Sequence, residues 1–286
     1  MQIVRSPRAL SQWSKRLRRE GVTIGMVPTM GALHAGHRAL IRTARLACDA
    51  VVVTLFVNPT QFGPKEDFLR YPRRFPSDAA LCEQEGVDVV YAPTLRAMYP
   101  PESQTTVNVE RLSRRWEGAV RPEHFRGVAT VVAKLLCAGQ PDIAFFGQKD
   151  FQQVMVVKQM IEDLNLATRV QVCPTVREPD GLALSSRNTY LGRAERRAAP
   201  ILHAALEAGR HAVRSGVRSG ARLNRIMRAR MADEPLARID YLAVCDPRTL
   251  EPLDRIGTQA VLLGAIRIGG VRLIDNVIVN VPKRRG

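Results

Sequence analysis

The sequence predicts an α/β protein, with a mostly parallel, doubly wound sheet first and a smaller α+β domain after it. Three observations support this. Apolar, β-branched runs of strand length alternate with helical patterns through about residue 173. Near residue 176 the sequence becomes polar and rich in turn residues. Beyond it, helical stretches come before strand-like runs, which is typical of an α+β domain. We therefore expect domains at residues 1–176 and 177–286.

The elements of the first domain are read from apolar runs and from the residues that end them. After a short strand and a charged helix, Val22–Val27 forms a strand that stops at Pro28. Ala50–Val57 is apolar throughout, as a strand covered on both faces should be. The other expected strands are Val87–Tyr91, Asp142–Phe146 and Arg169–Cys173, and the expected helices are Gly36–Cys48, Ser77–Glu85 with Ser77 as N-cap, Gly127–Ala138 and Asp150–Leu164.

The second domain is expected to contain two helices and three strands. The helical stretches are rich in arginine and alanine, and the strands are apolar. The expected elements are the helices Ala194–Ser215 and Gly220–Met231 and the strands Ile239–Val244, Ala260–Ile268 and Val271–Val281.

Composition sets limits on the function. With 45% hydrophobic residues in 286, the chain can bury a sizeable core. It has no run of 18 apolar residues, and its first 20 residues lack an apolar signal core. We therefore expect a cytoplasmic protein with no membrane association. The five cysteines include no C-x-x-C pair, which argues against a disulfide framework and a zinc site.

The net charge of +16 points to an anionic partner, either a nucleic acid or a small substrate that carries phosphate. The basic residues are spread along the chain, and arginine greatly outnumbers lysine, as a genome-wide bias would produce. This distribution favours the small substrate. Nucleic-acid binding is kept as the alternative from another class of function.

The strongest local motif is Pro28–His37 (PTMGALHAGH), which follows the first long strand and opens a helix. A helix N-terminus offers free N–H groups and a positive dipole end, both suited to phosphate. His34 and His37 share one face of a helical turn, and Gly36 allows close approach of a nucleotide. The two imidazoles can donate hydrogen bonds to phosphate oxygens. The alternative is that one histidine packs and the other caps the helix.

A second motif, Phe56–Phe62, follows the second buried strand. Asn58 and Pro59 force a turn there. Gln61 then points from a loop near the expected cleft, and its neutral amide can both donate and accept, which suits a hydroxy acid. A purely turn-stabilising amide is the alternative.

The third motif, Phe145–Gln153, lies at the end of another strand. Lys149 can meet nucleotide phosphates. Asp150 can equally be the N-cap of the next helix. Gln152 and Gln153 are adjacent and face different sides of that helix, so at most one should face the cleft.

The fourth motif is Leu184–Asn188, in the stretch between the domains. Ser185, Ser186 and Arg187 form an anion clamp on a mobile loop. The chain has no P-loop motif and no metal-ligand cluster in its sequence, so any Mg²⁺ would mainly be carried on the phosphates of a nucleotide.

Together these four segments resemble the pantothenate synthetase family. The likeness runs nearly end to end and includes Arg121–Val132, Asp240–Leu242 and Arg272–Asn276. The H-x-G-H motif alone would indicate only the wider nucleotidyltransferase superfamily, which includes class I aminoacyl-tRNA synthetases. Another adenylyl- or cytidylyltransferase of that superfamily is the nearest alternative, but it has no reason to carry Gln61 and Gln153.

The resemblance implies a Rossmann-like N-terminal domain and a smaller C-terminal lid, in a homodimer. It also implies a reaction in two steps. The carboxylate of pantoate attacks the α-phosphate of ATP·Mg²⁺ and releases pyrophosphate. The amine of β-alanine then attacks the pantoyl-adenylate, giving pantothenate and AMP.

Site residues are implied by the same likeness. His37 would be the proton donor, with His34 and Lys149 on the phosphates, and Gln61 and Gln153 would hold pantoate. Gln61 would also lie near β-alanine. The residues implied to bind ATP are Met30, Gly31, Ala32, Leu33, His34, Ala35, Gly36, His37, Gly147, Gln148, Lys149, Asp150, Val176, Leu184, Ser185, Ser186 and Arg187.

Two positions depart from the family pattern. Thr60 replaces a larger apolar residue, commonly Met, and this affects the expected shape of the pantoate pocket. Glu123 stands where Gly is common. For Arg121 and His124, packing, dimer and substrate-contact roles stay open.

Overall fold

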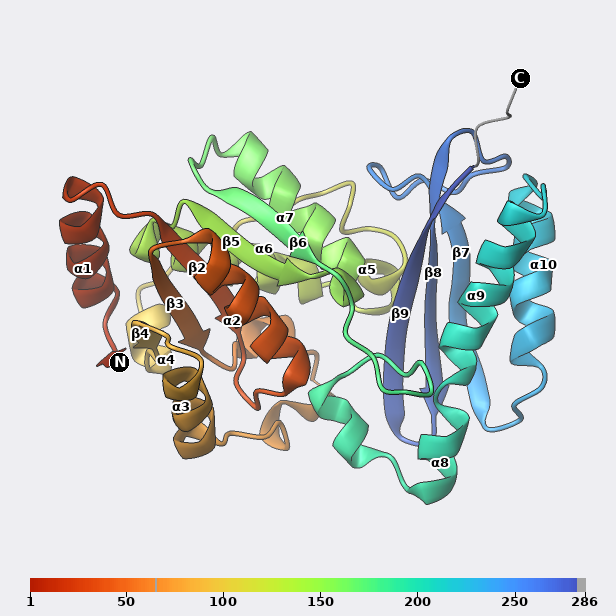
Figure 1. The fold of residues 1–286 in the computed structure, drawn as a ribbon, viewed down its shortest axis with the longest axis horizontal. Helices are drawn as coiled ribbons and strands as arrows, with labels where there is room; N and C mark the ends of the chain where they lie inside the picture. The colour runs from red at the N-terminus through yellow and green to blue at the C-terminus, as the bar shows by residue number, and fades with distance from the viewer. Residues whose placement is uncertain (65, 282–286) are drawn as a thin grey trace. The chain divides into compact units, whose positions relative to one another are not determined.

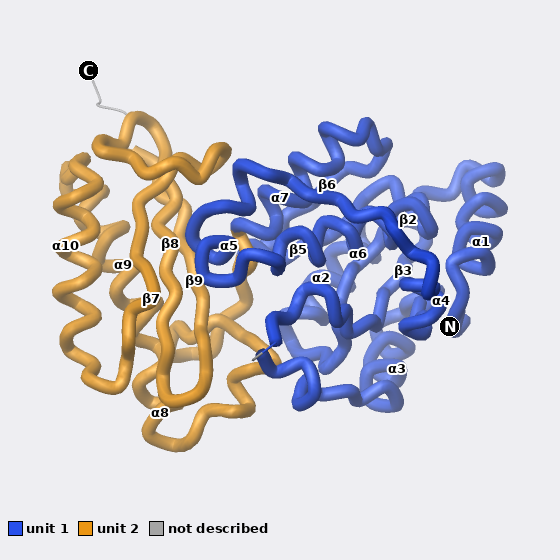
Figure 2. The backbone as a smooth tube through the Cα atoms, turned by 180° about the vertical axis from the view of Figure 1, so that it is seen from behind, with its two compact units in different colours: residues 1–148, 152–174 blue, residues 149–151, 175–286 orange. Residues whose placement is uncertain are grey.

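The computed structural model describes residues 1–64 and 66–281, and these residues form two units. Unit 1 contains residues 1–148 and 152–174, and unit 2 contains residues 149–151 and 175–286 (Figure 2). The sequence-based boundary after residue 176 lies near this division. Residues 149–151, which the sequence would assign to the first domain, group with unit 2.

Unit 1 contains the expected parallel sheet. Every strand pair in it is parallel, and the spatial order is β1-β4-β3-β2-β5-β6 (Figure 1). The strands are β1 (Gln2–Val4), β2 (Ile24–Thr29), β3 (Ala50–Leu55), β4 (Val89–Tyr91), β5 (Ile143–Gly147) and β6 (Arg169–Cys173). The chain moves outward from β2 to β3 and β4, then returns to place β5 on the other side of β2. In such sheets, ligands bind beyond the carboxyl ends of the strands at this reversal.

Helices cover both faces of this sheet, as a doubly wound fold requires. On one face, Leu40 of α2 and Cys82 of α3 belong to a buried cluster with Val27 and Phe145. Met26 points to the opposite face, because successive strand residues alternate. The helices of unit 1 are α1 (Pro7–Arg19), α2 (Ala35–Ala47), α3 (Phe75–Gln84), α4 (Leu95–Met98), α5 (Glu117–Val120), α6 (His124–Gly139) and α7 (Phe151–Asp163), whose first residue groups with unit 2.

Close packing of α1 and α6 against the second face explains a glycine in α6. A Cβ at Gly139 would lie only 2.2 Å from Met26 Cε and 3.5 Å from Leu10 Cδ2. Both side chains are completely buried. Any larger residue at this position would require the end of the buried Met26 side chain to move.

The expected N-cap at Ser77 is wrong. Helix α3 begins two positions earlier, at Phe75, with Arg74 as a cap residue that makes no side-chain hydrogen bond. The Ser77 hydroxyl donates to the Arg74 carbonyl over 2.9 Å. Pro76 explains the shift, because proline fits the first turn of a helix, where its missing N–H has no partner to lose.

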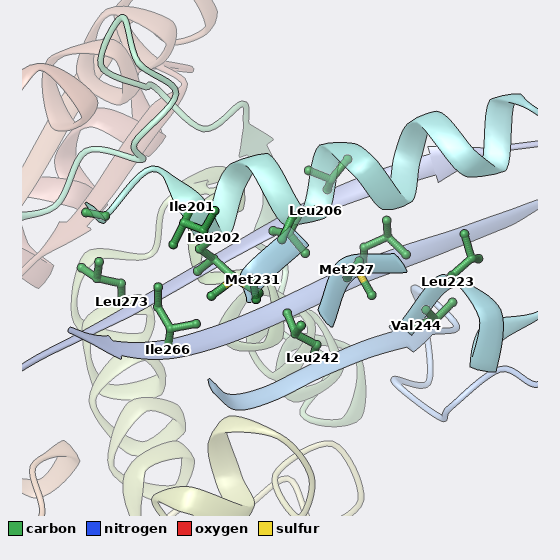
Figure 3. Close-up of a cluster of buried hydrophobic side chains, with 14 of the residues drawn as sticks. Ile201, Leu202, Leu206, Leu223, Met227, Met231, Leu242, Val244, Ile266 and Leu273 are labelled. Carbon is green, nitrogen blue, oxygen red and sulfur yellow. The ribbon is translucent and has the colours of Figure 1, made fainter. Parts of the chain in front are cut away.

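Unit 2 is an antiparallel sheet of β7 (Ala237–Cys245), β8 (Gln259–Ile268) and β9 (Val271–Asn280), with helices α9 (Ile201–Arg214) and α10 (Gly220–Met231) on one face (Figure 1). This confirms the expected α+β class. The close-up in Figure 3 shows the core between α9, α10 and the sheet. Its labelled members include Leu202, Leu206, Met227, Leu242 and Ile266.

One helix of unit 2 was expected over Ala194–Ser215, and this expectation is wrong. The chain forms α8 (Arg193–Ala198) and then α9, with Pro200 at the break. Proline cannot donate the backbone hydrogen bond that would continue α8 through this point.

The longest helix in the described part of the chain is α6, with 16 residues. None of the helices formed by residues 1–64 and 66–281 has the length and apolar character needed to span a lipid bilayer.

Candidate functional site

The loop after β2 is held by a buried carboxylate. Asp78 of α3 is only 4% exposed, and its two oxygens accept the N–H groups of Ala32 and Leu33, each over 2.8 Å. The Gly31 N–H donates to the Thr29 hydroxyl over 3.1 Å. Gly31 and Ala32 have φ angles of 81° and 51°, a turn that favours glycine at the first position.

Sequence reasoning missed Asp78. The available signal was its spacing, because Asp78 precedes the buried Cys82 by one helical turn and so lies on the apolar face of α3. A carboxylate on such a face needs hydrogen-bond donors, and the loop after β2 supplies them.

Both histidines of the H-x-G-H motif use Nδ1 to organise the start of α2. His34 is the N-cap, and its Nδ1 accepts the Gly36 N–H over 3.1 Å. The Nδ1 of His37 accepts the His34 N–H over 3.3 Å. The ring centroids lie 4.1 Å apart. A neutral imidazole that accepts at Nδ1 carries its proton on Nε2, so each ring has an Nε2–H donor.

These contacts narrow one expectation and modify another. In the first turn of α2, the Gly36 N–H already has an acceptor within the protein, as do the N–H groups of Gly31, Ala32, Leu33 and His34 in the loop before it, so these five N–H groups are not free for phosphate. The alternative was that one histidine packs and the other caps the helix, but in the structure both rings accept backbone N–H groups at the start of α2. Each of these capping contacts uses the Nδ1 atom of the ring.

Gln61 lies at the end of a 3-10 turn, Pro59–Gln61, and is 8% exposed. Its Oε1 accepts from Asn58 Nδ2 over 3.2 Å, and its Nε2 lies 3.2 Å from Met30 Sδ. The structure thus brings together the loops after β2 and β3. Asn58 is 1% exposed, and the sequence predicts it only as a turn residue.

Arg121 and His124, whose roles were open, both contact the backbone of Gln61. Arg121 Nη2 lies 3.1 Å and His124 Nδ1 2.9 Å from the Gln61 carbonyl oxygen. Neither contact was visible in the sequence, because the partners are 60 or more positions apart.

The two adjacent glutamines of α7 differ sharply. Gln152 is 4% exposed, and its Nε2 donates to the Leu112 and Arg115 carbonyls over 2.7 and 2.8 Å. Its Oε1 accepts the Glu117 N–H over 3.0 Å. Gln152 is therefore a packing residue that holds an irregular segment, and Gln153, which is half-buried, remains the candidate of the pair.

The end of β5 is open at Gly147, where a Cβ would meet no atom within 4 Å. A 3-10 turn, Gln148–Asp150, follows directly and leads into α7. Within unit 2, the Lys149 carbonyl accepts from Asn276 Nδ2 over 3.0 Å, and Lys149 Nζ lies 3.8 Å from Asp150 Oδ1. The buried Asn276 of β9 thus fixes the backbone at Lys149.

The segment around Ser185–Arg187 belongs to a small hairpin-like loop of unit 2. The Leu184 N–H donates to the Val176 carbonyl over 3.0 Å, which joins two of the expected nucleotide contacts. Ser185 is the N-cap of the 3-10 helix Ser186–Tyr190, and its Oγ accepts the Arg187 N–H over 3.3 Å.

A buried ion pair fastens the base of this loop. Arg177 donates to both oxygens of Asp275 over 2.6 and 2.9 Å. Burial alone would raise the pKa of Asp275, but the nearby His203 ring, 3.5 Å away, and the hydrogen bonds and charge of Arg177 lower it overall. Asp275 is next to Asn276 in β9, so one strand supports both Lys149 and the 177–187 segment.

Among residues 1–64 and 66–281, no group of three or more His, Cys, Asp or Glu side chains could hold a metal ion.

Comparison with known proteins gives a consistent match. The sequence profile of the family described as pantoate-beta-alanine ligase matches residues 2–278. A curated relative named pantothenate synthetase, from Heliobacterium modesticaldum, is 51% identical over 98% of this chain and 100% of its own length. Another pantothenate synthetase, from Koribacter versatilis, is 48% identical over 98% of this chain and 96% of its own.

Solved structures agree. A pantothenate synthetase from Thermus thermophilus has a TM-score of 0.92 and 47% identity, covering 97% of this chain and 99% of its own. A pantoate-beta-alanine ligase from Francisella tularensis, in complex with beta-gamma ATP and beta-alanine, has a TM-score of 0.80 and 33% identity, with 97% of each chain covered.

Proposed function

Because this chain belongs to the pantoate-β-alanine ligase family, we propose that it joins pantoate to β-alanine with ATP through a pantoyl-adenylate. The structural observation that carries the mechanism is the start of α2. There, backbone N–H groups occupy Nδ1 of His34 and His37, so each neutral ring carries its proton on Nε2. Two adjacent neutral donors suit the stabilisation of phosphate oxygens on which charge develops.

In the proposed first step, a carboxylate oxygen of pantoate forms a bond to the α-phosphorus of ATP. The bond from that phosphorus to the bridging oxygen breaks, and pyrophosphate leaves with the electron pair. His37 would donate a hydrogen bond from Nε2 to the phosphate oxygens, with His34 beside it. Mg²⁺ carried with ATP would neutralise phosphate charge, and no protein cage for it is proposed.

In the proposed second step, the amine of β-alanine attacks the acyl carbon of the adenylate. The bond from this carbon to the bridging oxygen breaks, AMP leaves, and the nitrogen releases a proton. The attacking amine must be neutral, so the rate should rise with pH until another group titrates.

Substrate positions are proposed from the residues of each unit. In unit 1, Gln61 and Gln153 would hold pantoate, with Gln61 also near β-alanine. Met30 to His37 and Gly147 and Gln148 would bind the nucleotide. In unit 2, Lys149, Asp150, Val176 and the segment from Leu184 to Arg187 would do so. Lys149 and Arg187 would supply positive charge to the triphosphate, where bidentate and point-charge contacts are both effective.

An acyl-adenylate hydrolyses readily, so water must be excluded until the amine arrives. We propose that unit 2 serves as the lid. We also propose a homodimer in the cytoplasm, which size-exclusion chromatography with light scattering and cell fractionation would test.

A substrate-dependence assay tests the function. The protein is incubated with ATP and pantoate, with and without β-alanine, and the release of AMP is measured. An incubation with ATP and β-alanine but without pantoate is the control. The proposal expects rapid AMP release only when both acids are present. Nucleotide transfer that does not need pantoate would instead support another nucleotidyltransferase, and steeply salt-dependent nucleic-acid affinity without AMP release would support the nucleic-acid alternative.

A further inference from the structure

We propose that Arg121 and His124 are positioning residues that hold the backbone carbonyl of Gln61, so that the Gln61 side chain presents a hydrogen-bond donor to an oxygen of pantoate. The inference deepens the proposed function and rests on it. It also separates these two side chains from direct substrate contact.

The orientation of the Gln61 amide follows from hydrogen-bond donors and acceptors whose roles are fixed, beginning at Asn58. The Gly127 carbonyl can only accept a hydrogen bond, and it lies 3.1 Å from Asn58 Nδ2. The other side-chain atom, Asn58 Oδ1, lies 2.9 Å from the Tyr99 hydroxyl and 3.0 Å from the Thr60 hydroxyl, both of which can donate. Asn58 therefore has one possible orientation, with its NH₂ toward Gly127.

The same NH₂ group lies 3.2 Å from Gln61 Oε1. A donor at this place requires the oxygen of the Gln61 amide to face Asn58. The Gln61 NH₂ then faces away from Asn58, on the side of Met30 Sδ. Gln61 consequently offers N–H donors rather than an acceptor, and donors suit the carboxylate or hydroxyl oxygens of pantoate.

The backbone of Gln61 is fixed separately. Its carbonyl oxygen is 2.9 Å from His124 Nδ1 and 3.1 Å from Arg121 Nη2. Since a carbonyl only accepts, His124 must carry its proton on Nδ1. Its Nε2 then has no proton to donate while the ring is neutral.

The charge state of His124 agrees with this role. Burial, together with the nearby charge of Arg121, lowers the pKa of His124 to about 4. The ring is therefore neutral at physiological pH, with a single tautomer fixed by the Gln61 carbonyl. A neutral donor can hold a carbonyl without adding a second positive charge beside Arg121.

Arg121 is itself held by Glu66. The guanidinium donates from Nε and Nη2 to the two Glu66 oxygens over 2.6 and 2.5 Å. Burial alone would raise the pKa of Glu66, but the hydrogen bonds and charge of Arg121 lower it overall. With its fork engaged by Glu66 and Nη2 also reaching Gln61, Arg121 is tied to the protein rather than presented to a substrate carboxylate.

Helix α6 approaches this turn too closely for any side chain. A Cβ at Gly127 would lie 2.3 Å from the Thr60 carbonyl oxygen and 2.6 Å from the Gln61 backbone nitrogen. The first turns of α6, which carry His124, therefore press directly on the 3-10 turn that carries Gln61. The resulting cluster, Asn58, Gln61, Glu66, Arg121 and His124, lies wholly within unit 1.

Two substitutions of His124 test the proposal against direct substrate contact. In His124→Asn, the side-chain amide nitrogen can take the place of Nδ1 and keep the bond to the Gln61 carbonyl. In His124→Gln, the amide reaches instead to the place of Nε2. Binding of pantoate and of ATP is measured by calorimetry for both variants and the natural sequence, and thermal unfolding is followed in parallel.

The proposal expects His124→Asn to bind pantoate within about threefold of the natural protein. His124→Gln should bind pantoate roughly tenfold more weakly, as loss of one hydrogen bond implies, with ATP affinity unchanged. The opposite order, with His124→Gln retaining pantoate and His124→Asn losing it, would show that Nε2 contacts the substrate and would overturn the proposal. Equal loss of pantoate and ATP affinity in both variants, alongside lowered stability, would also overturn it.

Gln61→Glu tests the polarity of the amide and does not depend on the folding of a His124 variant. The carboxylate introduced by this substitution can still accept from Asn58 but cannot donate. We expect pantoate affinity to fall by about 10²-fold or more and ATP affinity to change less than threefold. Retained pantoate affinity would contradict a donor role for Gln61.

The outcomes separate this inference from the proposed function. If the natural protein fails to bind pantoate at all, the proposed function fails. If it binds pantoate and both His124 variants bind it equally well, only the positioning inference fails.

Discussion

In unit 1 the candidate site residues follow the carboxyl ends of parallel strands, whereas in unit 2 they lie on connections fastened to one antiparallel strand, β9. The unit 1 residues hold one another in place. His34 and His37 share a hydrogen bond through the His34 backbone, and Gln61 contacts Asn58 and Met30. In unit 2 the support comes from Asn276 and Asp275, which are not themselves candidate contacts.

This difference shows where a substitution can remove a proposed substrate contact without also removing a contact that stabilises the fold. In unit 1 one side chain often both stabilises the fold and is a proposed substrate contact. A substitution there must keep the atom that stabilises the fold and remove the atom proposed to contact the substrate. In unit 2 the supporting residues and the proposed phosphate contacts are different residues, so each group can be removed alone.

The buried ion pair of unit 2 should give the largest effect. Arg177→Met leaves the Asp275 carboxylate, 4% exposed, without its bidentate partner. We expect the free energy of unfolding to fall by about 3–5 kcal/mol, because the buried carboxylate loses the guanidinium that pairs with it. Urea unfolding measures this.

The matched control is Arg196→Met, which breaks the exposed pair with Asp180, whose side chain is 42% exposed. It should cost less than about 1 kcal/mol. Equal losses for the two variants would show that the Arg177 pair does not fasten unit 2.

Loss of the proposed phosphate contact at Lys149 should be nearly as large. Lys149→Ala should slow pantoyl-adenylate formation by about 10²-fold or more, since a transition-state charge contact is removed. Pyrophosphate release in a single turnover measures the step. Lys158→Ala, an exposed lysine on α7, is the control and should be near normal. Normal pyrophosphate release by Lys149→Ala would remove Lys149 from the mechanism.

The pH dependence of stability should reveal the neutral His124. Burial and Arg121 lower the pKa of this ring from 6.5 to about 4. Between these pH values the unfolded chain binds a proton that the folded protein does not, so stability falls as the pH falls. The loss attributable to His124 should approach about 2–3 kcal/mol at pH 4. His124→Asn should flatten this part of the profile of unfolding free energy, and an unchanged profile would contradict a neutral buried ring.

The smallest effect should come from the cap of α2. His34→Ala removes the acceptor of the Gly36 N–H and should lower stability by about 1 kcal/mol. His34→Asn supplies a good N-cap oxygen and should keep stability within a few tenths of a kcal/mol, while the imidazole Nε2 is lost. Both variants should lose at least about tenfold in adenylate formation. Normal activity of His34→Asn would mean that His34 serves only as a cap.

The sequence predicts the helices and strands better than it predicts the contacts that hold the candidate site residues in place. The apolar run at Ala50–Val57 indicates a buried strand, and β3 covers most of it. Proline positions decide where the expectations fail, since Pro76 admits an earlier start of α3 and Pro200 divides a helix. These local effects could be anticipated from the chemistry of proline.

The supporting contacts could not be anticipated in the same way. The orientation of Gln61 depends on Gly127 through Asn58, across 69 positions, and the loop at Ala32 depends on Asp78, across 46. Neither partner belongs to a recognisable motif with the residue it serves. Only the folded sheet, which brings the ends of β2 and β3 together, reveals them. The assignment of substrate contacts to His34, His37, Gln61, Gln153 and Lys149 stays a prediction.

The fate of the pantoate carboxylate oxygens tests the central claim most directly. Pantoate labelled with ¹⁸O in its carboxylate is converted with ATP and β-alanine, and the products are analysed by mass spectrometry. If a pantoyl-adenylate forms, its bridging oxygen leaves with AMP, so one ¹⁸O atom should appear in the AMP phosphate and none in pyrophosphate. Unlabelled AMP, or label in inorganic phosphate accompanied by ADP, would contradict the adenylate mechanism.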